Sequence, residues 1–367
     1  MPRILILTAS IGEGHNTAAR NIHDAVLAET HGTSEVLVAD PYTRTNPIVN
    51  RLVQKSYATA INRYPRTWKI VFELLSKRGV VEGMGPLLTE LTTAVRELIA
   101  EFRPDIIAST YPIFSYIITK IRRRDPAVVV PFYTVITDST LINAVWYRYP
   151  CEGSLVADES TAATMRHDGA APEKIHVLGF PVNIAFESLT PTSPPADGKW
   201  KALFFPSGKT QYAVDVLQHL GDIPNLEVTV ITGRRYKVHA VLKEAGLPKN
   251  GTLMGWTDEM PKLMTTHHIF IGKAGGATVQ EAIAAQIPFL VSHVVPGQEE
   301  GNIALIEQTG IGTLATGAPR RISDLVLGAL ANDAALWKTW RANLTAQQKP
   351  SAARSIARFL LTRCGKK

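Results

Sequence analysis

Residues 3–20 read RILILTASIGEGHNTAAR, and they carry the clearest signal of the fold class. Residues 4–7 form a short aliphatic run, a glycine-containing loop follows, and a helical pattern extends over residues 17–29. A buried strand that leads through a tight loop into a helix is the repeating unit of parallel α/β proteins. Short β-rich runs and helical patterns keep alternating along the chain, so the sequence predicts a parallel α/β architecture.

Two blocks of this alternation are separated by residues 188–198, which are rich in proline and small polar residues and indicate a linker. The first block has expected strands at residues 4–7, 35–38, 105–108, 128–136, 154–157 and 175–178, and a second helix at 87–102. The second block has expected strands at residues 201–205, 227–231, 268–271 and 289–291, and a helix at 212–220. We therefore expect two doubly wound domains that face a central cleft, with ligands beyond the carboxyl ends of the strands.

The composition of the 367-residue chain is that of a globular protein, since 45% of its residues are hydrophobic and 19% are charged. This excludes a mainly disordered or fibrous chain. The two cysteines, Cys151 and Cys364, are too few for a disulfide framework and form no CxxC zinc motif, so we expect a reducing compartment. No stretch contains the roughly 18 uninterrupted apolar residues of a membrane span. We therefore expect a cytoplasmic protein without a transmembrane anchor.

The formal net charge is +7, and basic residues gather in two segments. Segment 44–78 contains eight basic residues and one acidic residue, whereas segment 337–367 contains eight basic residues and no acidic one. Aromatic and aliphatic residues are interleaved with both, including Trp68 in the first and Trp337 and Trp340 in the second. This combination suits an anionic membrane surface. Alternatively, each segment is a solvated helix face that packs on the core, and no nucleic-acid motif accompanies the charge.

The loop after the first strand contains Gly12, Gly14 and His15. The two glycines let the backbone turn tightly and approach a ligand, and the helix N-terminus that follows favours negative charge. The spacing matches neither the dinucleotide-binding G-x-G-x-x-G motif nor a Walker loop. A histidine at the mouth of the first strand can face the cleft and accept a proton near neutral pH. The alternative is a helix-capping loop with an incidental histidine.

A second glycine-containing loop follows the expected strand 268–271 and opens a helix. Gly275 and Gly276 allow close contact with a phosphate, and Thr278 supplies a hydroxyl. Glu281, about one turn into the helix, is placed to accept two hydroxyls of a ribose. The alternative for Glu281 is a capping box with Thr278, which precedes it by three residues.

Two further loops carry polar residues at strand ends. Gln298 and Glu299 lie beyond the strand at 289–291 and suit hydrogen bonds to sugar hydroxyls, or else belong to an acidic exposed loop. Asp138 follows the strand at 128–136 and precedes Trp146 by eight residues. An acid at this position is a candidate base or orienting group, or else a helix N-cap.

Taken in order along the chain, these motifs resemble one known family. The motifs are LxLTASxGEGHxTAA at the N-terminus, Thr137-Asp138 with Trp146, Gly179-Phe180-Pro181-Val182, Gly255-Trp256-Thr257-Asp258-Glu259-Met260, GGATVQEA and PGQEEGN. The chain resembles the monogalactosyldiacylglycerol synthase and processive diacylglycerol glucosyltransferase group of GT-B glycosyltransferases, in glycosyltransferase family 28. The similarity extends from residue 4 to about residue 315, and the ordered set of motifs is specific although each motif alone is weak.

The resemblance implies an inverting transfer of a hexose from a UDP-sugar to diacylglycerol, which forms a β-glycoside. It implies that His15 is the general base and that Asp138 supports it or the acceptor, with Gly12, Gly14, Asn143 and Trp146 in acceptor-side loops. The residues implied in donor binding are Gly233, Arg234, Gly255, Trp256, Gly275, Gly276, Thr278, Glu281, Gln298 and Glu299. No metal and no cofactor is implied, because the UDP-sugar is a substrate.

The resemblance also implies the domain organisation and the partners. We expect an N-terminal acceptor domain at 1–187, a linker at 188–199, a UDP-sugar domain at 200–345 and a C-terminal helix at 346–367 that returns to the N-terminal domain. The expected partners are a UDP-sugar, a lipid acceptor and an anionic membrane contacted by the two basic segments, at the inner face of the cell membrane. The alternatives are transfer to another lipid or polyprenyl-linked acceptor, and a non-catalytic nucleotide-sugar-binding protein.

Overall fold

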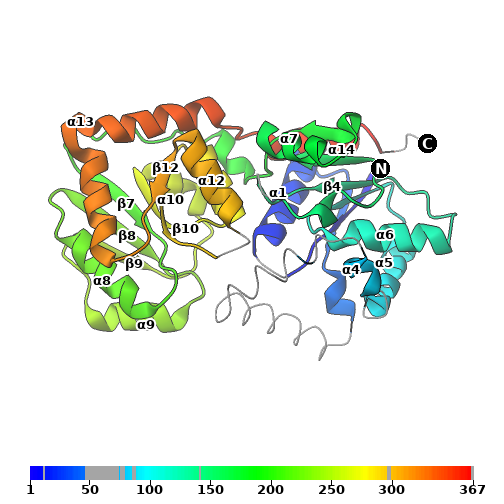
Figure 1. The fold of residues 1–367 in the computed structure, drawn as a ribbon, viewed down its shortest axis with the longest axis horizontal. Coiled ribbons are helices and arrows are strands. Elements are labelled where there is room, and N and C mark those ends of the chain that lie inside the picture. Colours follow the sequence, from blue (N-terminus) through cyan, green and yellow to red (C-terminus); the bar gives the residue numbers. More distant parts are fainter. Residues whose placement is uncertain are drawn as a thin grey trace. The chain divides into compact units, whose positions relative to one another are not determined.

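The computed structural model describes residues 1–10, 13–45, 74, 79–84, 88–139, 142–295 and 299–364, which form two compact units (Figure 1). Unit 1 comprises Met1–Ile184, Val295–Gly301 and Ser351–Lys367, and unit 2 comprises Ala185–Val294 and Asn302–Pro350. Gly12, Gln298 and most of segment 44–78, all of which carry predictions from the sequence, lie outside the described residues.

Unit 1 is built on a parallel sheet with the strand order β2-β1-β3-β4-β5-β6. The strands are β1 (Arg3–Leu7), β2 (Glu35–Ala39), β3 (Ile106–Ser109), β4 (Phe132–Val135), β5 (Gly153–Val156) and β6 (Ile175–Val177). The helices are α1 (Glu13–Glu29), α4 (Val80–Gly83), α5 (Thr89–Phe102), α6 (Ile113–Arg124), α7 (Glu159–His167) and α14 (Ala352–Leu361). Short 3-10 turns are η1 (Pro41–Arg44), η2 (Ala144–Trp146), η3 (Pro172–Lys174) and η4 (Ile184–Glu187). Because β2 and β3 flank β1, the winding direction reverses between β1 and β3, where α/β sheets bind ligands.

The aliphatic run of β1 packs on both faces of the sheet, which explains why its four core residues are consecutive. Ile4 and Ile6 pack with α1 and α14, whereas Leu5 and Leu7 pack with α5 and α6 on the opposite face. All four side chains are fully buried. Burial of an aliphatic side chain of this size stabilises a fold by about 1.5–3 kcal/mol, so β1 anchors both layers of the unit.

The C-terminal helix α14 packs on α1 within unit 1. Ile356 and Leu360 are fully buried in this interface. On the flank of the helix, the Glu29 carboxylate accepts hydrogen bonds from Arg354 Nη1 at 2.8 Å and from Arg358 Nε at 2.6 Å. These two arginines lower the pKa of Glu29. Apolar burial and a shared carboxylate therefore hold the end of the chain on α1.

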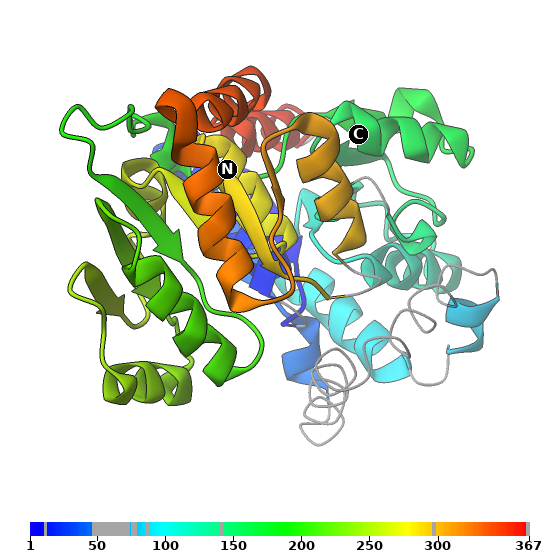
Figure 2. The ribbon, with the colours of Figure 1, turned by 60° about the vertical axis from the view of Figure 1, so that its left-hand side comes forward.

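Unit 2 is built on a second parallel sheet, with the strand order β12-β11-β10-β7-β8-β9. The strands are β7 (Trp200–Phe204), β8 (Leu226–Ile231), β9 (Gly251–Met254), β10 (Ile269–Lys273), β11 (Phe289–His293) and β12 (Gly312–Leu314). The helices are α8 (Thr210–Gly221), α9 (Tyr236–Ala245), α10 (Met260–Thr266), α11 (Gly276–Ala285), α12 (Glu300–Thr309) and α13 (Pro319–Gln347). Figure 2 shows α8 and α13 side by side over one face of this sheet, where both contribute to the core. The winding direction reverses between β7 and β10, which places a second switch point there.

The two tryptophans of segment 337–367 lie in the core of unit 2, so the prediction that they contact a membrane is wrong. Trp337 and Trp340 are 1% and 6% exposed, and Trp337 Nε1 donates to the His268 carbonyl oxygen at 2.7 Å. Arg341 of the same helix donates to the backbone carbonyl oxygens of Gln286 and Thr192. The alternative reading of this segment, a helix packed on the core by its apolar side, describes α13.

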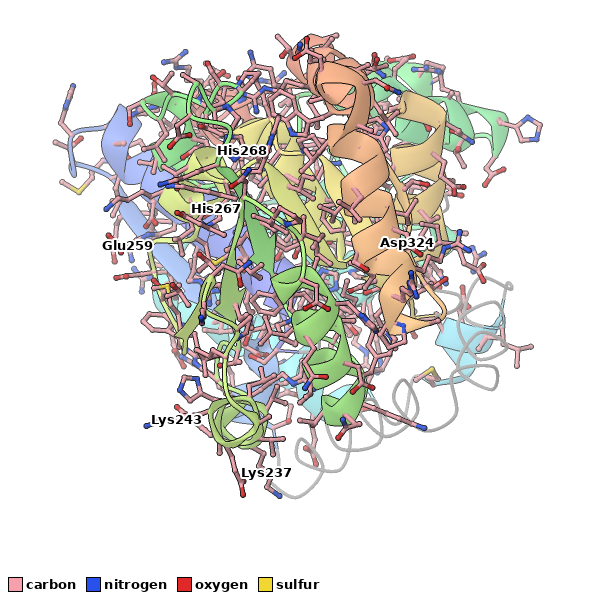
Figure 3. All side chains as sticks on the ribbon, turned by 90° about the vertical axis from the view of Figure 1, so that its left-hand side faces the viewer. Lys237, Lys243, Glu259, His267, His268 and Asp324 are labelled. Carbon is pink, nitrogen blue, oxygen red and sulfur yellow. The ribbon has the colours of Figure 1, made fainter. Side chains whose placement is uncertain are left out.

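The linker segment is tied to unit 2 by hydrogen bonds of its backbone groups. Thr192 N donates to the Thr265 carbonyl oxygen at 2.7 Å, and the His268 Nε2 atom lies 3.1 Å from the Ser193 carbonyl oxygen. Figure 3 labels His268 with its neighbour His267 in this region of the unit. Burial lowers the pKa of His268 to about 4, so this imidazole is neutral at physiological pH.

Two element boundaries differ from the sequence prediction in ways that affect the site. The strand expected at 128–136 is shorter, because β4 covers only Phe132–Val135 and the apolar Val129 is 76% exposed in the preceding loop. Helix α1 begins at Glu13 rather than at residue 17, so Gly14 and His15 belong to its first turn.

Candidate active site

His15 lies at the switch point of unit 1, in the first turn of α1 and next to the carboxyl ends of β1 and β3. The Thr110 hydroxyl, directly beyond β3, donates to the His15 carbonyl oxygen at 3.0 Å. In the loop after β1, Thr8 Oγ1 donates to Asn16 Oδ1 at 3.0 Å, which fixes the start of the helix. The backbone around His15 is therefore held from two neighbouring strands.

The imidazole of His15 is oriented by a hydroxyl from a third strand. Thr137 Oγ1, beyond the end of β4, lies 2.7 Å from His15 Nδ1, and the Thr137 side chain is 5% exposed. The Tyr111 ring packs edge-on against the imidazole with ring centroids 5.0 Å apart. When Nδ1–H donates to Thr137, the Nε2 lone pair is available to an acceptor hydroxyl.

Asp138 is positioned by the residue that the sequence places eight positions later. The Trp146 indole nitrogen donates to Asp138 Oδ2 at 2.7 Å, and Trp146 is fully buried. The helix cap in this loop comes from Asn143, whose side-chain oxygen accepts from Val145 N at 3.0 Å and begins η2. Trp146 thus anchors the carboxylate, and Asn143 fixes the turn that carries Trp146.

His15 and Asp138 form an electrostatically coupled pair. Burial lowers the pKa of His15 below its ordinary value, and the negative charge of Asp138 and a hydrogen bond to the Thr110 backbone oppose this shift. Burial raises the pKa of Asp138, and the charge of His15 and the Trp146 hydrogen bond oppose that shift. A neutral imidazole can take a proton, and the neighbouring carboxylate stabilises the imidazolium that results.

We predict that Thr137→Val lowers the turnover of any reaction in which His15 acts as a base, by about tenfold to a hundredfold. The valine keeps the shape of the buried side chain but removes the hydroxyl that holds Nδ1. Thr137→Ser restores the hydroxyl and should recover most of the activity. Steady-state kinetics measure the effect, which should appear in kcat, with the KM for the nucleotide donor unchanged. Equal losses in both variants would show that the hydroxyl has no role.

In unit 2, the turn between β10 and α11 brings together a cation, a hydroxyl and a helix N-terminus. The N-cap of α11 is Gly275, which supplies no side-chain hydrogen bond to the first turn. A Cβ atom built on Gly275 would lie 3.9 Å from Lys273 Nζ and 3.7 Å from Thr278 Oγ1. Such a turn, with Gly276 as the first helical residue, suits the charge of a phosphate group.

Glu281 lies within α11, so the capping box with Thr278 considered from the sequence is wrong. Among the described residues, the Glu281 carboxyl has no hydrogen-bond or ion-pair partner, and burial raises its pKa to about 7. A half-buried carboxyl without a partner is costly to keep unless a ligand supplies hydrogen-bond donors. Paired ribose hydroxyls are donors of this kind.

Four residues predicted to bind the nucleotide follow β8 and β9. They lie together at the ends of these two neighbouring strands. The Arg234 guanidinium lies over the Trp256 ring at 5.5 Å from the ring centroid, and Trp256 is 58% exposed. Gly233 has a φ of +56°, a conformation that favours glycine. Gly255 precedes Trp256, and a Cβ atom there would meet nothing within 4 Å, so the backbone of this turn is open to a flat base.

Glu299 is not part of an exposed acidic loop. It is 3% exposed, and its Oε2 atom accepts a hydrogen bond from Val295 N at 2.8 Å. The carboxylate therefore shapes its own loop. Asn302, three residues further on, donates from Nδ2 to the Ala274 carbonyl oxygen at 2.9 Å and so supports the turn that precedes Gly275.

Several residues of the site were not predicted from the sequence. Thr110, Thr137 and Tyr111 hold His15 from other strands, and Lys273 ends β10 beside Gly275. Arg235, rather than its neighbour Arg234, ties two loops by donating to the Pro206 carbonyl oxygen at 2.6 Å. The sequence signal that could have identified Thr110, Thr137 and Lys273 as site residues is their position at the ends of strands.

The described part of the chain has neither of two larger features, a metal site and a membrane span. It contains no cluster of three or more His, Cys, Asp or Glu side chains that could hold a metal ion. None of its helices combines the length and apolar character needed to cross a bilayer.

Comparison with known sequences shows where the similarity lies. Residues 15–182 match the family model described as monogalactosyldiacylglycerol (MGDG) synthase. The processive diacylglycerol β-glucosyltransferase of Bacillus subtilis (strain 168) is 26% identical over 347 residues, which cover 90% of this chain and 87% of that protein. The probable chloroplastic monogalactosyldiacylglycerol synthase of Nicotiana tabacum is 24% identical over 344 residues, covering 88% of this chain and 64% of that protein.

Solved structures with the same fold cover nearly the whole chain. MurG of Acinetobacter baumannii superimposes with a TM-score of 0.64 at 14% identity, covering 98% of this chain and 100% of that one. MnaA of S. aureus with UDP superimposes with a TM-score of 0.66 at 13% identity, covering 100% and 99%. The fold class predicted from the sequence, an α/β protein of GT-B type, is confirmed. The matches in sequence support the resemblance of this chain to the family of monogalactosyldiacylglycerol synthases and processive diacylglycerol glucosyltransferases.

Proposed function

We propose that this protein is an inverting glycosyltransferase that moves a hexose from a UDP-sugar to the hydroxyl of diacylglycerol and forms a β-glycoside. The observation that carries the proposal is the placement of the His15 imidazole, which Thr137 holds beside Asp138 at a switch point. It occurs in a chain whose relatives are named as diacylglycerol glucosyltransferases and galactolipid synthases. A nucleotide-binding protein without catalysis has no need of such a base.

In the proposed reaction, unit 1 acts on the acceptor. The hydroxyl oxygen of diacylglycerol attacks C1 of the sugar as its proton passes to His15. The imidazolium that forms lies beside Asp138, whose charge attracts it. Thr137 and Tyr111 keep the imidazole in one orientation during this step. General-base catalysis of this kind contributes about 10²–10⁴-fold to a rate.

Unit 2 acts on the donor in the same proposal. The bond between C1 and the diphosphate oxygen breaks, and UDP leaves with the electron pair. The N-terminus of α11, with Lys273 and Thr278, stabilises the developing charge on the diphosphate. Glu281 accepts the ribose hydroxyls, and the turn at Gly255 and Trp256 receives the uracil. The UDP-sugar is a substrate, and the proposal includes no cofactor, so chelation of divalent metals is expected to leave transfer unchanged.

The acceptor lipid resides in a membrane, so the proposed enzyme works as a peripheral protein on the inner face of the cell membrane. The basic and aromatic residues of segment 44–78 are predicted to contribute to this docking. Segment 337–367 is not included, because its two tryptophans are buried.

Transfer of radiolabelled sugar tests the proposal. UDP-galactose, UDP-glucose and UDP-N-acetylglucosamine are supplied separately with diacylglycerol in anionic vesicles, and the lipid fraction is analysed. We expect one labelled monoglycosyl lipid with a β linkage, and the preferred donor identifies the hexose. Tight UDP binding without a labelled lipid from any donor would contradict the proposal, as would a product that forms only on a polyprenyl-linked acceptor.

A further inference from the structure

Helix α9 of unit 2 exposes apolar residues that most surface helices bury. Tyr236 is 76% exposed, Val241 is 39% exposed and Leu247, just beyond the helix, is 38% exposed. Only Val238 and Leu242 of the helix are buried against the unit. Nine large apolar side chains are exposed in the described part of the chain, and three of them lie in this one short segment. Exposed apolar side chains that gather in one segment are typical of interaction surfaces.

Unpaired basic residues surround these apolar side chains. Lys237, Lys243 and Lys249 are exposed and form no ion pair with any residue that the structure describes. Figure 3 shows the side chains of Lys237 and Lys243 projecting outward from α9. Elsewhere in the unit, the exposed Lys262 and Lys338 pair with neighbouring carboxylates, whereas Lys199 is exposed and forms no ion pair with a described residue. Glu244 is the one acidic residue between positions 236 and 249.

We define the α9 face as Tyr236, Lys237, Val241, Lys243, Leu247 and Lys249, and we propose that it rests on the surface of an anionic lipid bilayer. Lysines attract the anionic headgroups, and the aromatic and aliphatic side chains enter the boundary between headgroups and acyl chains. An acidic protein would match the charge but not this mixture of an aromatic ring with isolated aliphatic groups between lysines. The docking rests on the proposed function, because an enzyme that acts on a lipid acceptor must reach the membrane. Binding to the bilayer can nevertheless be measured without any sugar transfer.

Vesicle sedimentation in the absence of any sugar donor tests this docking. The full chain is mixed with phosphatidylcholine vesicles that contain phosphatidylglycerol, at low and at high salt. The variant Lys237→Glu/Lys243→Glu/Lys249→Glu removes the attraction, and Lys199→Glu/Lys262→Glu/Lys338→Glu makes the same change in net charge at exposed positions elsewhere in unit 2. A third variant, Val241→Ser/Leu247→Ser, removes the aliphatic anchors and keeps the charge. Thermal unfolding of each variant checks that it folds.

We expect the α9 charge variant to bind at least about tenfold more weakly than the unchanged protein at low salt, and the control variant within about twofold. The serine variant should weaken binding at both salt concentrations, since apolar insertion is not screened. Equal losses in the two charge variants would overturn the proposal, because only net charge would then matter. Normal vesicle binding by the α9 variant in an active enzyme would overturn it too. If binding depends on the α9 lysines but the protein makes no glycolipid, the docking proposal stands and the proposed function is contradicted.

Discussion

His15→Ala is expected to reduce sugar transfer by about 10³-fold while UDP binding stays within a factor of about two. The imidazole lies in unit 1, where it contacts Thr137 and Tyr111, and no donor-binding residue of unit 2 is needed to hold it. Removing it takes away the base and leaves the acceptor hydroxyl with its proton. The loss should therefore fall on kcat. Initial rates with labelled donor, and UDP titration by calorimetry, measure the two effects separately.

His23→Ala is the matched control, because His23 lies on the same helix and pairs with the adjacent Asp24 near the surface. This variant should keep full activity. In the unchanged protein, kcat should rise with pH as His15 loses its proton and level off below the ordinary imidazole pKa, because burial lowers the pKa of His15. A His15→Ala enzyme that keeps a tenth of the activity and the same pH profile would remove His15 from the mechanism.

The fold was predictable because both sheets are parallel and buried on both faces. The residues of β1 are consecutive aliphatics for this reason, and the loop that follows each strand stands out against them. The same logic located the site loops, since ligands bind at the carboxyl ends of parallel strands. His15, Asp138 and Gly275 were predicted as site residues from their place after a strand, without any information on contacts.

The partners of these residues could not be predicted in the same way. Thr137 is 122 residues from His15 in the sequence, and only the pairing of β1, β3 and β4 brings the two together. Glu299 lies in an acidic sequence that is typical of exposed loops. Its side chain is nevertheless buried, where the backbone N–H of Val295 donates a hydrogen bond to the carboxylate. Trp337 and Trp340 alternate with basic residues in the sequence. This pattern occurs both where aromatic rings face lipid and where they pack in the core, so the sequence alone could not distinguish the two.

Glu281→Gln is expected to weaken binding of a UDP-sugar by about tenfold or more and, at the same time, to stabilise the protein at pH 8. The folded-state pKa of about 7 lies above the ordinary value of 4.5, so the folded chain keeps a proton that the unfolded chain loses between these pH values. Stability therefore falls as the pH rises from 4.5 to 7, by at most about 3 kcal/mol, and the whole penalty is present above pH 7. The amide of the variant carries no charge at any of these pH values, so Glu281→Gln removes this loss of stability.

Thermal unfolding of the unliganded protein measures the stability effect, which should reach about 5 °C in Tm at pH 8 and vanish near pH 5. The pH dependence of UDP-sugar binding is the second measurement. If the ribose hydroxyls bind the ionised carboxylate, the Kd of the unchanged protein should rise about tenfold for each pH unit below 7, whereas Glu281→Gln should bind independently of pH. A UDP-sugar is the better ligand for this titration than UDP, because its diphosphate has no terminal phosphate group that takes up a proton near neutral pH. Glu307→Gln, an exposed change in the same unit, should alter neither quantity. Stabilisation without loss of affinity would mean that the half-buried Glu281 carboxyl binds no nucleotide, and that the donor site must be sought elsewhere in unit 2.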